Sequence, residues 1–452
     1  MTETSAGAGF RRPLILRSPA FGAVWLGQVL TQAAVRMFQV GASWWLVAYA
    51  VGSGRGLASG LFMAVSTLPA VALAPVVARV IARNARRSVL RTAAGLAGIA
   101  AAALAAWAWA GGLPPAAVYA GALALATCQA FFDPCLTTSV PELVDDEDIE
   151  SATGFELSTQ SLAGLCGALF GALLVDRVGV AGLAVGCATA YLAAALLVAS
   201  VRFRTVTVTP PTDETPAPKE RTLSAILHGL PHVRRILICF TAANLFTTAV
   251  FVVIPLYTRN VLGDGGGTVA LLEASLGVGT LTGAFIGARV PGRPTVTGAY
   301  CLGLMAAALA LPGLTADRPV IACCLAVAGC CVGVIGVRFV ALFQRLVPPV
   351  DKPGFFAVMQ AVLGATFPVA SLLFGVAGDQ LGVQALCLAQ GAGLVPVACA
   401  LVLLGRGDPL LAAHHPASGK GAGTGTEPEA EADAGHPDTR TSRTSESAGD
   451  VR

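Results

Sequence analysis

Long apolar stretches recur along this 452-residue chain, and polar residues or glycine and proline separate each stretch from the next. A helix crosses a bilayer when about 20 consecutive residues are mostly apolar. A membrane β-barrel would instead show alternating segments of about ten residues. The pattern therefore predicts an all-α membrane protein with twelve transmembrane helices, near residues 21–49, 57–81, 89–110, 116–132, 151–175, 180–201, 235–258, 268–290, 295–314, 320–346, 355–378 and 383–404.

The longest interior break in this pattern contains the segment VTPPTDETPAPKE. Its proline-rich, polar composition is typical of an extended, solvated linker. Six spans precede it and six follow, which predicts two six-helix bundles. The last residues are rich in Gly, Ser, Thr, Glu and Asp, and they are expected to be disordered because they bury too little apolar surface to fold. The expected parts are an arm at 1–20, bundles at 21–201 and 234–405, a linker at 202–233 and a tail at 406–452.

The first span carries a regular polar stripe. Its members are spaced by four, four, three and four residues, and at about 100° per residue they fall within an arc of about 80° on one helix face. Polar groups facing hydrocarbon cost several kcal/mol each, so this face is expected to line a polar cavity that binds substrate. The stripe consists of Gln28, Gln32, Arg36, Gln39 and Ser43. For Arg36, two roles stay open: a cavity role, or a structural ion pair between spans.

Composition narrows the function. Only 12% of the residues are charged, against about 25% in soluble domains, and the net charge of +3 is too small to indicate a nucleic-acid partner. The twelve cysteines lie in or beside apolar runs without a CxxC pair, so we interpret them as packing residues. Without a Walker A, GxSxG or HExxH motif, we expect no enzyme, no cofactor and no metal. The expected partners are a small-molecule substrate, the lipid bilayer and protons, and the expected state is a monomer.

Lys and Arg concentrate in alternate loops, at 83–87, 202–234, 289–293 and 345–352. Cytoplasmic loops of membrane proteins carry this excess of positive charge. With an even number of spans, both termini and the linker are therefore predicted to be cytoplasmic, in a multi-pass protein of the cell membrane.

Two carboxylates are candidates for proton coupling. Asp133 ends the fourth span four residues after Gln129, and Glu156 lies early in the fifth span four residues before Gln160. A carboxylate in an apolar site can gain and lose a proton near neutral pH. The alternative is that Asp133 caps a helix end and Glu156 faces the cytoplasm.

The second half offers milder candidates. Thr241, Asn244 and Thr248 form a polar stripe on the seventh span, and Asn244 is predicted to bind substrate. Arg338, near the cytoplasmic end of the tenth span, either lines the cavity or snorkels to the interface. Glu273, early in the eighth span, is expected at the outer surface. The acidic run at 145–150 is expected to be a solvated loop.

Particular segments carry a family resemblance. The first span contains WLGQVLTQ and RMFQVGASWWLV, residues 131–144 read FFDPCLTTSVPELV, and residues 341–349 read ALFQRLVPP. These segments resemble the macrolide-efflux and enterobactin-exporter-like branch of the major facilitator superfamily, and the resemblance spans about residues 18 to 405. It implies two rocking bundles around a central site and the export of drug-like or siderophore-like molecules.

The chain departs from the family pattern at two carboxylates. In the basic turn after the second span, Ala82 stands where the family has aspartate, whereas Arg83, Arg86 and Arg87 are kept as gating candidates. Val35 stands where relatives of the first span carry another aspartate. The family resemblance implies proton-coupled efflux of an amphipathic molecule. The two missing carboxylates instead favour an alternative, an uncoupled facilitator or a non-transporting accessory or immunity protein.

Overall fold

The computed structural model describes residues 19–139, 143–144, 149–201, 231–348 and 352–406. The chain forms two compact units, Met1–Asp408 and Pro409–Arg452, and the second lies outside the described residues. All regular elements described in the first unit are helical. The elements of the first half are α2 (Pro19–Trp45) with a π-helical turn (Leu46–Ala50), α3 (Arg55–Ala72), α4 (Ala74–Arg83), α5 (Arg86–Ala110), α6 (Pro115–Thr137) and α7 (Ile149–Ser200).

The second half repeats this plan, again with helices alternating in direction. Its elements are α9 (Pro231–Thr248), α10 (Val250–Tyr257) with a π-helical turn (Thr258–Leu262), α11 (Gly266–Gly287), α12 (Pro294–Ala310), α13 (Arg318–Leu346), α14 (Lys352–Leu381) and α15 (Val383–Arg406). Helices α3 and α4 together make one span, as do α9 and α10. The prediction of twelve transmembrane helices in two six-helix bundles is confirmed.

Helix α7 contains two spans, which turn back on each other at Gly179. That residue has φ of +72°, a conformation that side chains disfavour and glycine permits. Ten helices in the described residues are long and apolar enough to cross a membrane, and one of them is the 40-residue stretch Ser161–Ser200. Helix α2 is not among the ten, because its glutamines and arginine lower its mean hydropathy.

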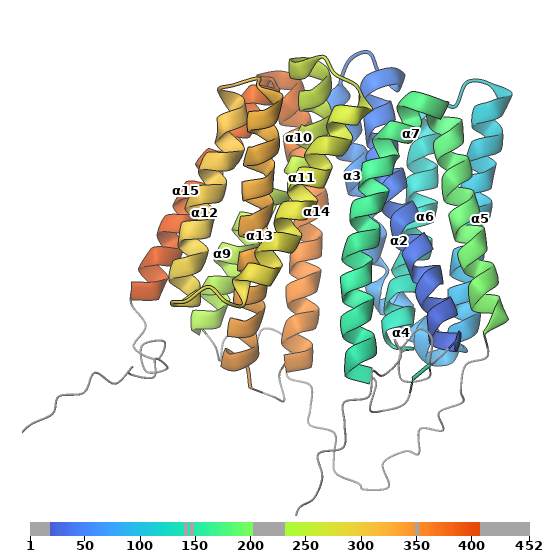
Figure 1. The fold of residues 1–452 in the computed structure, drawn as a ribbon, viewed down its shortest axis with the longest axis horizontal. Helices are drawn as coiled ribbons and strands as arrows, with labels where there is room; N and C mark the ends of the chain where they lie inside the picture. Colours follow the sequence, from blue (N-terminus) through green and yellow to red (C-terminus); the bar gives the residue numbers. More distant parts are fainter. Residues whose placement is uncertain (1–18, 140–142, 145–148, 202–230, 349–351, 407–452) are drawn as a thin grey trace, which may run out of the picture. The chain divides into compact units, whose positions relative to one another are not determined.

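Each bundle is held by helix pairs that touch along their length. In the first half α2 and α5 pack on α7, and in the second half α13 packs on α11 and α12 on α15 (Figure 1). The two halves meet where α3 packs on α14 and α7 packs on α11. Glycines of α7 permit close packing on α2: a Cβ at Gly167 would lie 2.3 Å from the Ala33 carbonyl oxygen, and one at Gly171 2.5 Å from that of Met37.

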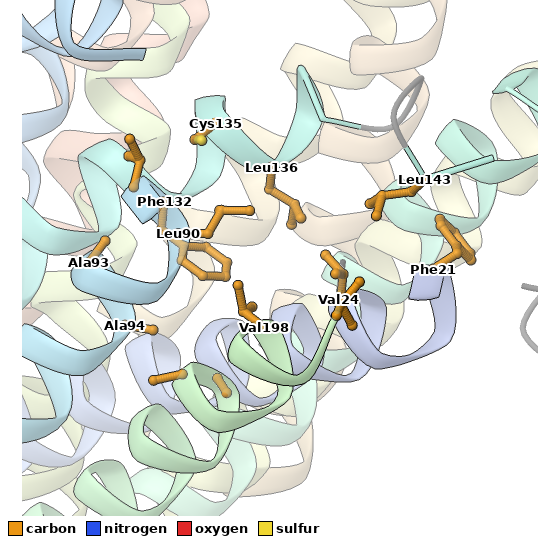
Figure 2. Packing of buried hydrophobic residues seen from close by; sticks show 14 of the residues in the cluster. Phe21, Val24, Leu90, Ala93, Ala94, Phe132, Cys135, Leu136, Leu143 and Val198 are labelled. Carbon is orange, nitrogen blue, oxygen red and sulfur yellow. The ribbon is translucent and has the colours of Figure 1, made fainter. Parts of the chain in front are cut away.

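We call the end at which α2 begins and α7 finishes the linker end, and the opposite end the distal end. An apolar core fills the linker end of the first bundle, where Phe21, Val24, Leu90, Phe132 and Val198 converge from four helices (Figure 2). Helix α6 continues beyond residue 132, near which the fourth span is expected to end, to Thr137. Burial of the helix extension in this core stabilises it despite the proline at position 134.

Candidate functional site

Two adjoining cavities lie between the halves. The first has a volume of about 540 Å³ and the second about 460 Å³. Residues of α2 line both cavities, and so do Asn244 and Thr248 of α9. These volumes lie in the range of about 300–1,000 Å³ that drug-sized ligands occupy.

The polar stripe of α2 divides between these cavities and the helix contacts beside them. Arg36 and Gln32 line the second cavity and Gln39 lines the first. Gln28 is only 2% exposed, and Ser43 is buried against Ser59 with 3.0 Å between their hydroxyl oxygens. The stripe therefore faces other helices along its whole length, and its middle reaches the cavities.

Arg36 is held by two weak partners. Its Nη1 donates to Gln39 Oε1 over 3.1 Å, and its guanidinium carbon lies 5.2 Å from the centre of the Phe251 ring. Phe251 in turn stacks on Phe367 with 5.6 Å between ring centres. A cation over an aromatic face is stabilised by about 0.5–2 kcal/mol. The Arg36 guanidinium and the two stacked rings thus lie in the walls of the two cavities.

Asp133 lines the first cavity and lies among amide donors. Gln32 Nε2 donates to its Oδ1 over 2.7 Å, and Gln129 Nε2 donates to the same oxygen over 2.5 Å. The i,i+4 pair of Gln129 and Asp133 seen in the sequence thus gains a third member from α2. The other candidate, Glu156, lies in α7, but its side chain is outside the described residues, as is the acidic run at 145–148.

Glu273 lies in the wall of the second cavity, together with Arg36. It is 5% exposed and interacts electrostatically with the Arg36 guanidinium. The prediction that Glu273 lies at the outer surface is wrong. It is the eighth residue of α11, and the facing helices of both halves cover it.

Asn244 of α9 lines both cavities, as Thr248 does. Its Nδ2 donates to the Leu363 carbonyl oxygen over 3.2 Å and to Thr366 Oγ1 over 2.5 Å, so it joins α9 to α14. Thr241, the first residue of the predicted stripe, donates to a backbone carbonyl of its own helix. Asn244 and Thr248 are therefore the stripe members that reach the cavities.

Comparison with known proteins decides the family. The family model described as Major Facilitator Superfamily matches residues 24–349, well over half of the chain. The chain belongs to the major facilitator superfamily. Members of this family are membrane transporters rather than enzymes. No curated protein sequence matches this transporter.

Solved structures of other transporters share the fold. A bacterial homolog of the human lysosomal transporter Spinster, inward-facing and occupied, is 14% identical, with a TM-score of 0.69 over 87% of this chain and 98% of that one. The nucleoside transporter NupG is 12% identical, with a TM-score of 0.68 over 86% and 100%. A bacterial homologue of the iron transporter ferroportin, inward-facing, is 14% identical, with a TM-score of 0.66 over 87% and 99%. At these identities the likeness shows the fold alone.

Apart from Arg36, the arginines of this transporter that the sequence offered for gating or binding lie at the linker end. Arg86 donates to the Thr138 carbonyl and Arg87 to the Ala199 carbonyl, so both bind the ends of neighbouring helices in their own bundle. Arg83 is exposed at the end of α4. Arg338 of α13 likewise donates to two backbone carbonyls, those of Val290 over 2.7 Å and Gly292, and it lies outside both cavity linings.

At the distal end of the transporter, an aspartate of α7 binds the start of α11. Asp176 accepts hydrogen bonds from the Gly266 backbone N–H, from Trp44 Nε1 over 2.6 Å and from the Tyr49 hydroxyl over 2.8 Å. The first N–H groups of a helix have no partner within it and carry partial positive charge. A carboxylate from the first half thus caps a helix of the second half.

The reciprocal contact lies between α14 and α3. Asp379 accepts hydrogen bonds from the backbone N–H groups of Gly56 and Leu57, each over 2.8 Å. Here a carboxylate of the second half caps a helix of the first. Neither aspartate was a candidate in the sequence, although the repeat Asp-x-x-Gly-Val, at Asp176 and again at Asp379, was a visible signal.

Proposed function

We propose that this transporter exports a small amphipathic molecule, such as an antibiotic, a siderophore or another natural product, in exchange for protons. The observation that carries the proposal is a pair of drug-sized cavities between the halves, with Arg36 in the wall. Two bundles that rock about such a site expose it to each side of the membrane in turn. The resemblance to the macrolide-efflux and enterobactin-exporter-like branch supports export as the direction.

The chemistry of the walls supports an amphipathic substrate. More than half of the lining residues of each cavity are apolar, among them the stacked Phe251 and Phe367, and the others carry polar side chains. Apolar and aromatic walls with placed polar groups are typical of small-molecule sites. Gln32, Arg36 and Gln39 are proposed to contact substrate, since each lines a cavity.

Further proposed contacts differ in their support. Asn244 lines both cavities, which favours substrate contact. Gln28 and Ser43 are buried among helices, which favours a structural role. Asp133 is proposed as a proton-coupling group because it lines the first cavity, and Glu156 stays a second candidate. The basic loops support a cytoplasmic linker end in the cell membrane.

Transport into inverted vesicles tests this proposal. Vesicles that hold the wild-type protein are expected to accumulate a compound from a panel of antibiotics and siderophores when the lumen is acidic, and less so without the gradient. Arg36→Ala is expected to reduce uptake at least tenfold. Arg91→Ala, which removes an exposed guanidinium of α5 outside both cavities, is the matched control. Uptake of no compound, or equal uptake by both variants, would contradict the proposal.

A second candidate function is uncoupled transport or a non-transporting role. Val35 lines the first cavity at the position where the resemblance leads one to expect a carboxylate, and Ala82 replaces another at the basic turn. Restoring the second group discriminates between the candidates. A large gain of gradient-driven transport in Ala82→Asp would favour the uncoupled protein, and unchanged transport would favour coupling through other groups.

A further inference from the structure

Four side chains that contact one another lie between the two cavities. Gln39 and Phe367 line the first cavity, whereas Arg36 and Phe251 line the second. Arg36 Nη1 donates to Gln39 Oε1 over 3.1 Å, so this hydrogen bond joins one cavity wall to the other. The ring of Phe251 stacks on that of Phe367 with 5.6 Å between their centres, and this contact does the same. We call these four side chains the divider.

One contact of the divider joins the two halves of the transporter. Arg36 and Gln39 both belong to α2 of the first half, whereas Phe251 of α10 and Phe367 of α14 belong to the second. The divider therefore passes from one half to the other where the Arg36 guanidinium lies 5.2 Å from the centre of the Phe251 ring. Bundles that rock change the distances between halves, while contacts within a half persist. The contact of Arg36 with Phe251 is thus the part of the divider that rocking can break.

A second position for the Arg36 guanidinium lies on the side of the second cavity. Glu273 lines this cavity together with Arg36, is 5% exposed and interacts electrostatically with the guanidinium. Rotation of the Arg36 side chain toward Glu273 would exchange a contact with an aromatic face for a closer contact between opposite charges. Such a rotation would open the divider without leaving the guanidinium buried and unpartnered, which would be costly.

We propose that Arg36 and Phe251 form a gate inside the substrate site, between two subsites for aromatic amphipathic molecules. With the gate closed, the cavities of about 540 and 460 Å³ each hold one small molecule. With the gate open, they join into one chamber and hold a single molecule that is too large for either. The joined chamber lies near the upper end of the range of about 300–1,000 Å³ for ligand pockets. This inference rests on the proposed function and makes Phe251 a residue that determines substrate size.

Binding of two matched probes to the full-length protein in lipid nanodiscs tests the inference. The probes are tritiated N-phenyl-1-naphthylamine, an uncharged aromatic amphiphile, and its dimer joined by a short alkyl linker, with binding to empty nanodiscs subtracted. The wild type is expected to bind two molecules of the monomer or one of the dimer, and each probe should displace the other.

Removal of the aromatic ring should favour the larger probe. Phe251→Ala is expected to raise the affinity for the dimer by about two- to thirtyfold, the binding ratio that corresponds to one cation–π contact, without raising the affinity for the monomer. Phe251→Leu, which keeps an apolar side chain without an aromatic face, should change the ratio of affinities in the same direction. Phe285→Ala, which removes a ring of α11 that is 73% exposed and outside both cavities, should behave as wild type.

The ratio of the two affinities distinguishes a gate from a purely structural role, because a loss of folding lowers both affinities. An unchanged ratio in the two Phe251 variants, at the melting temperature of the wild type, would overturn the inference and leave export intact. A wild type that binds one monomer, or whose bound monomers the dimer does not displace, would overturn it without any variant. If vesicles accumulate a compound but neither probe binds, the inference alone fails. If neither probe binds and vesicles accumulate no compound, the proposed function fails as well.

Discussion

The distal and linker ends of this transporter use charged side chains in opposite ways. At the distal end, Asp176 and Asp379 cap the starts of helices that belong to the other half. At the linker end, Arg87 and Arg338 bind helix-end carbonyls of their own half. Both arrangements suit the helix dipole, which favours anions at helix starts and cations at helix ends. These two distal carboxylates thus join the two halves, whereas these linker-end charges strengthen each half separately.

This difference has a consequence for alternating access. Contacts between halves must break when the cavities open toward that end, whereas contacts within a half persist throughout the cycle. Because both aspartates are exposed, each cap contributes only about 1 kcal/mol, a strength that permits repeated opening. Substitutions at the two ends should therefore produce different defects.

The largest effect is expected from substitution of a glycine where α3 packs on α14 at the distal end. A Cβ at Gly60 of α3 would lie 2.2 Å from the Ser371 carbonyl oxygen of α14, so Gly60→Ala must push the two helices apart. The conformation in which the distal end is closed should be destabilised by about 1–3 kcal/mol. Spin-label distances between α3 and α14 at that end should lengthen. Gly95→Ala is the control, since a Cβ there meets nothing within 4 Å. Unchanged distances in Gly60→Ala would contradict the close contact between α3 and α14 at the distal end.

Removal of both caps should come next. The double variant Asp176→Ala/Asp379→Ala is expected to lose about 2 kcal/mol of distal closure, with each single variant losing about half. The same distance measurement should show a larger open population in the double variant. Distances that match the wild type would mean that the aspartates do not hold the halves together.

A smaller and different effect is expected at the linker end. Arg87→Gln removes the charged bond to the Ala199 carbonyl, at a cost of about 1 kcal/mol to the first bundle. The melting temperature in detergent should fall by a few degrees, while distal distances stay as in the wild type. If distal distances changed and the melting temperature did not, the division between the two ends would be wrong.

The smallest effect is expected from Tyr49→Phe. The hydroxyl of Tyr49 is one of three donors to Asp176, and its partly exposed bond contributes about 0.5 kcal/mol. The population with an open distal end should increase by no more than about twofold, and only when Asp176 is present. An equal shift in the Asp176→Ala background would show that the hydroxyl acts elsewhere.

Hydrophobic periodicity predicted the fold of this protein, because long apolar runs mark most of the helices that can cross a bilayer. The helical rotation of about 100° per residue also predicted that the polar stripe of α2 faces other helices. Gln32, Arg36 and Gln39 of this stripe do reach the cavities. Glu273 could not be placed in this way. Its depth along α11 follows from the sequence, but its neighbour Arg36 comes from the other half of the chain, and no local pattern encodes that contact.

The caps at the distal end show the same limit. The repeated Asp-x-x-Gly-Val marks two equivalent turns, and Gly179 and Gly382 both have positive φ there. A repeat shows that two positions are equivalent but not which helix start each carboxylate meets. That pairing depends on how the halves pack, which long-range contacts determine.

Thiol accessibility in the cavity tests the central claim most directly. In a chain whose native cysteines are replaced and whose transport is retained, Gln39→Cys is treated with a membrane-impermeant thiol reagent from each face of the membrane. The account predicts reaction from the linker face, and reaction from the distal face that increases several-fold in Asp176→Ala/Asp379→Ala. A cysteine that reacts from neither face, with or without the two aspartates, would contradict a water-filled site between the halves.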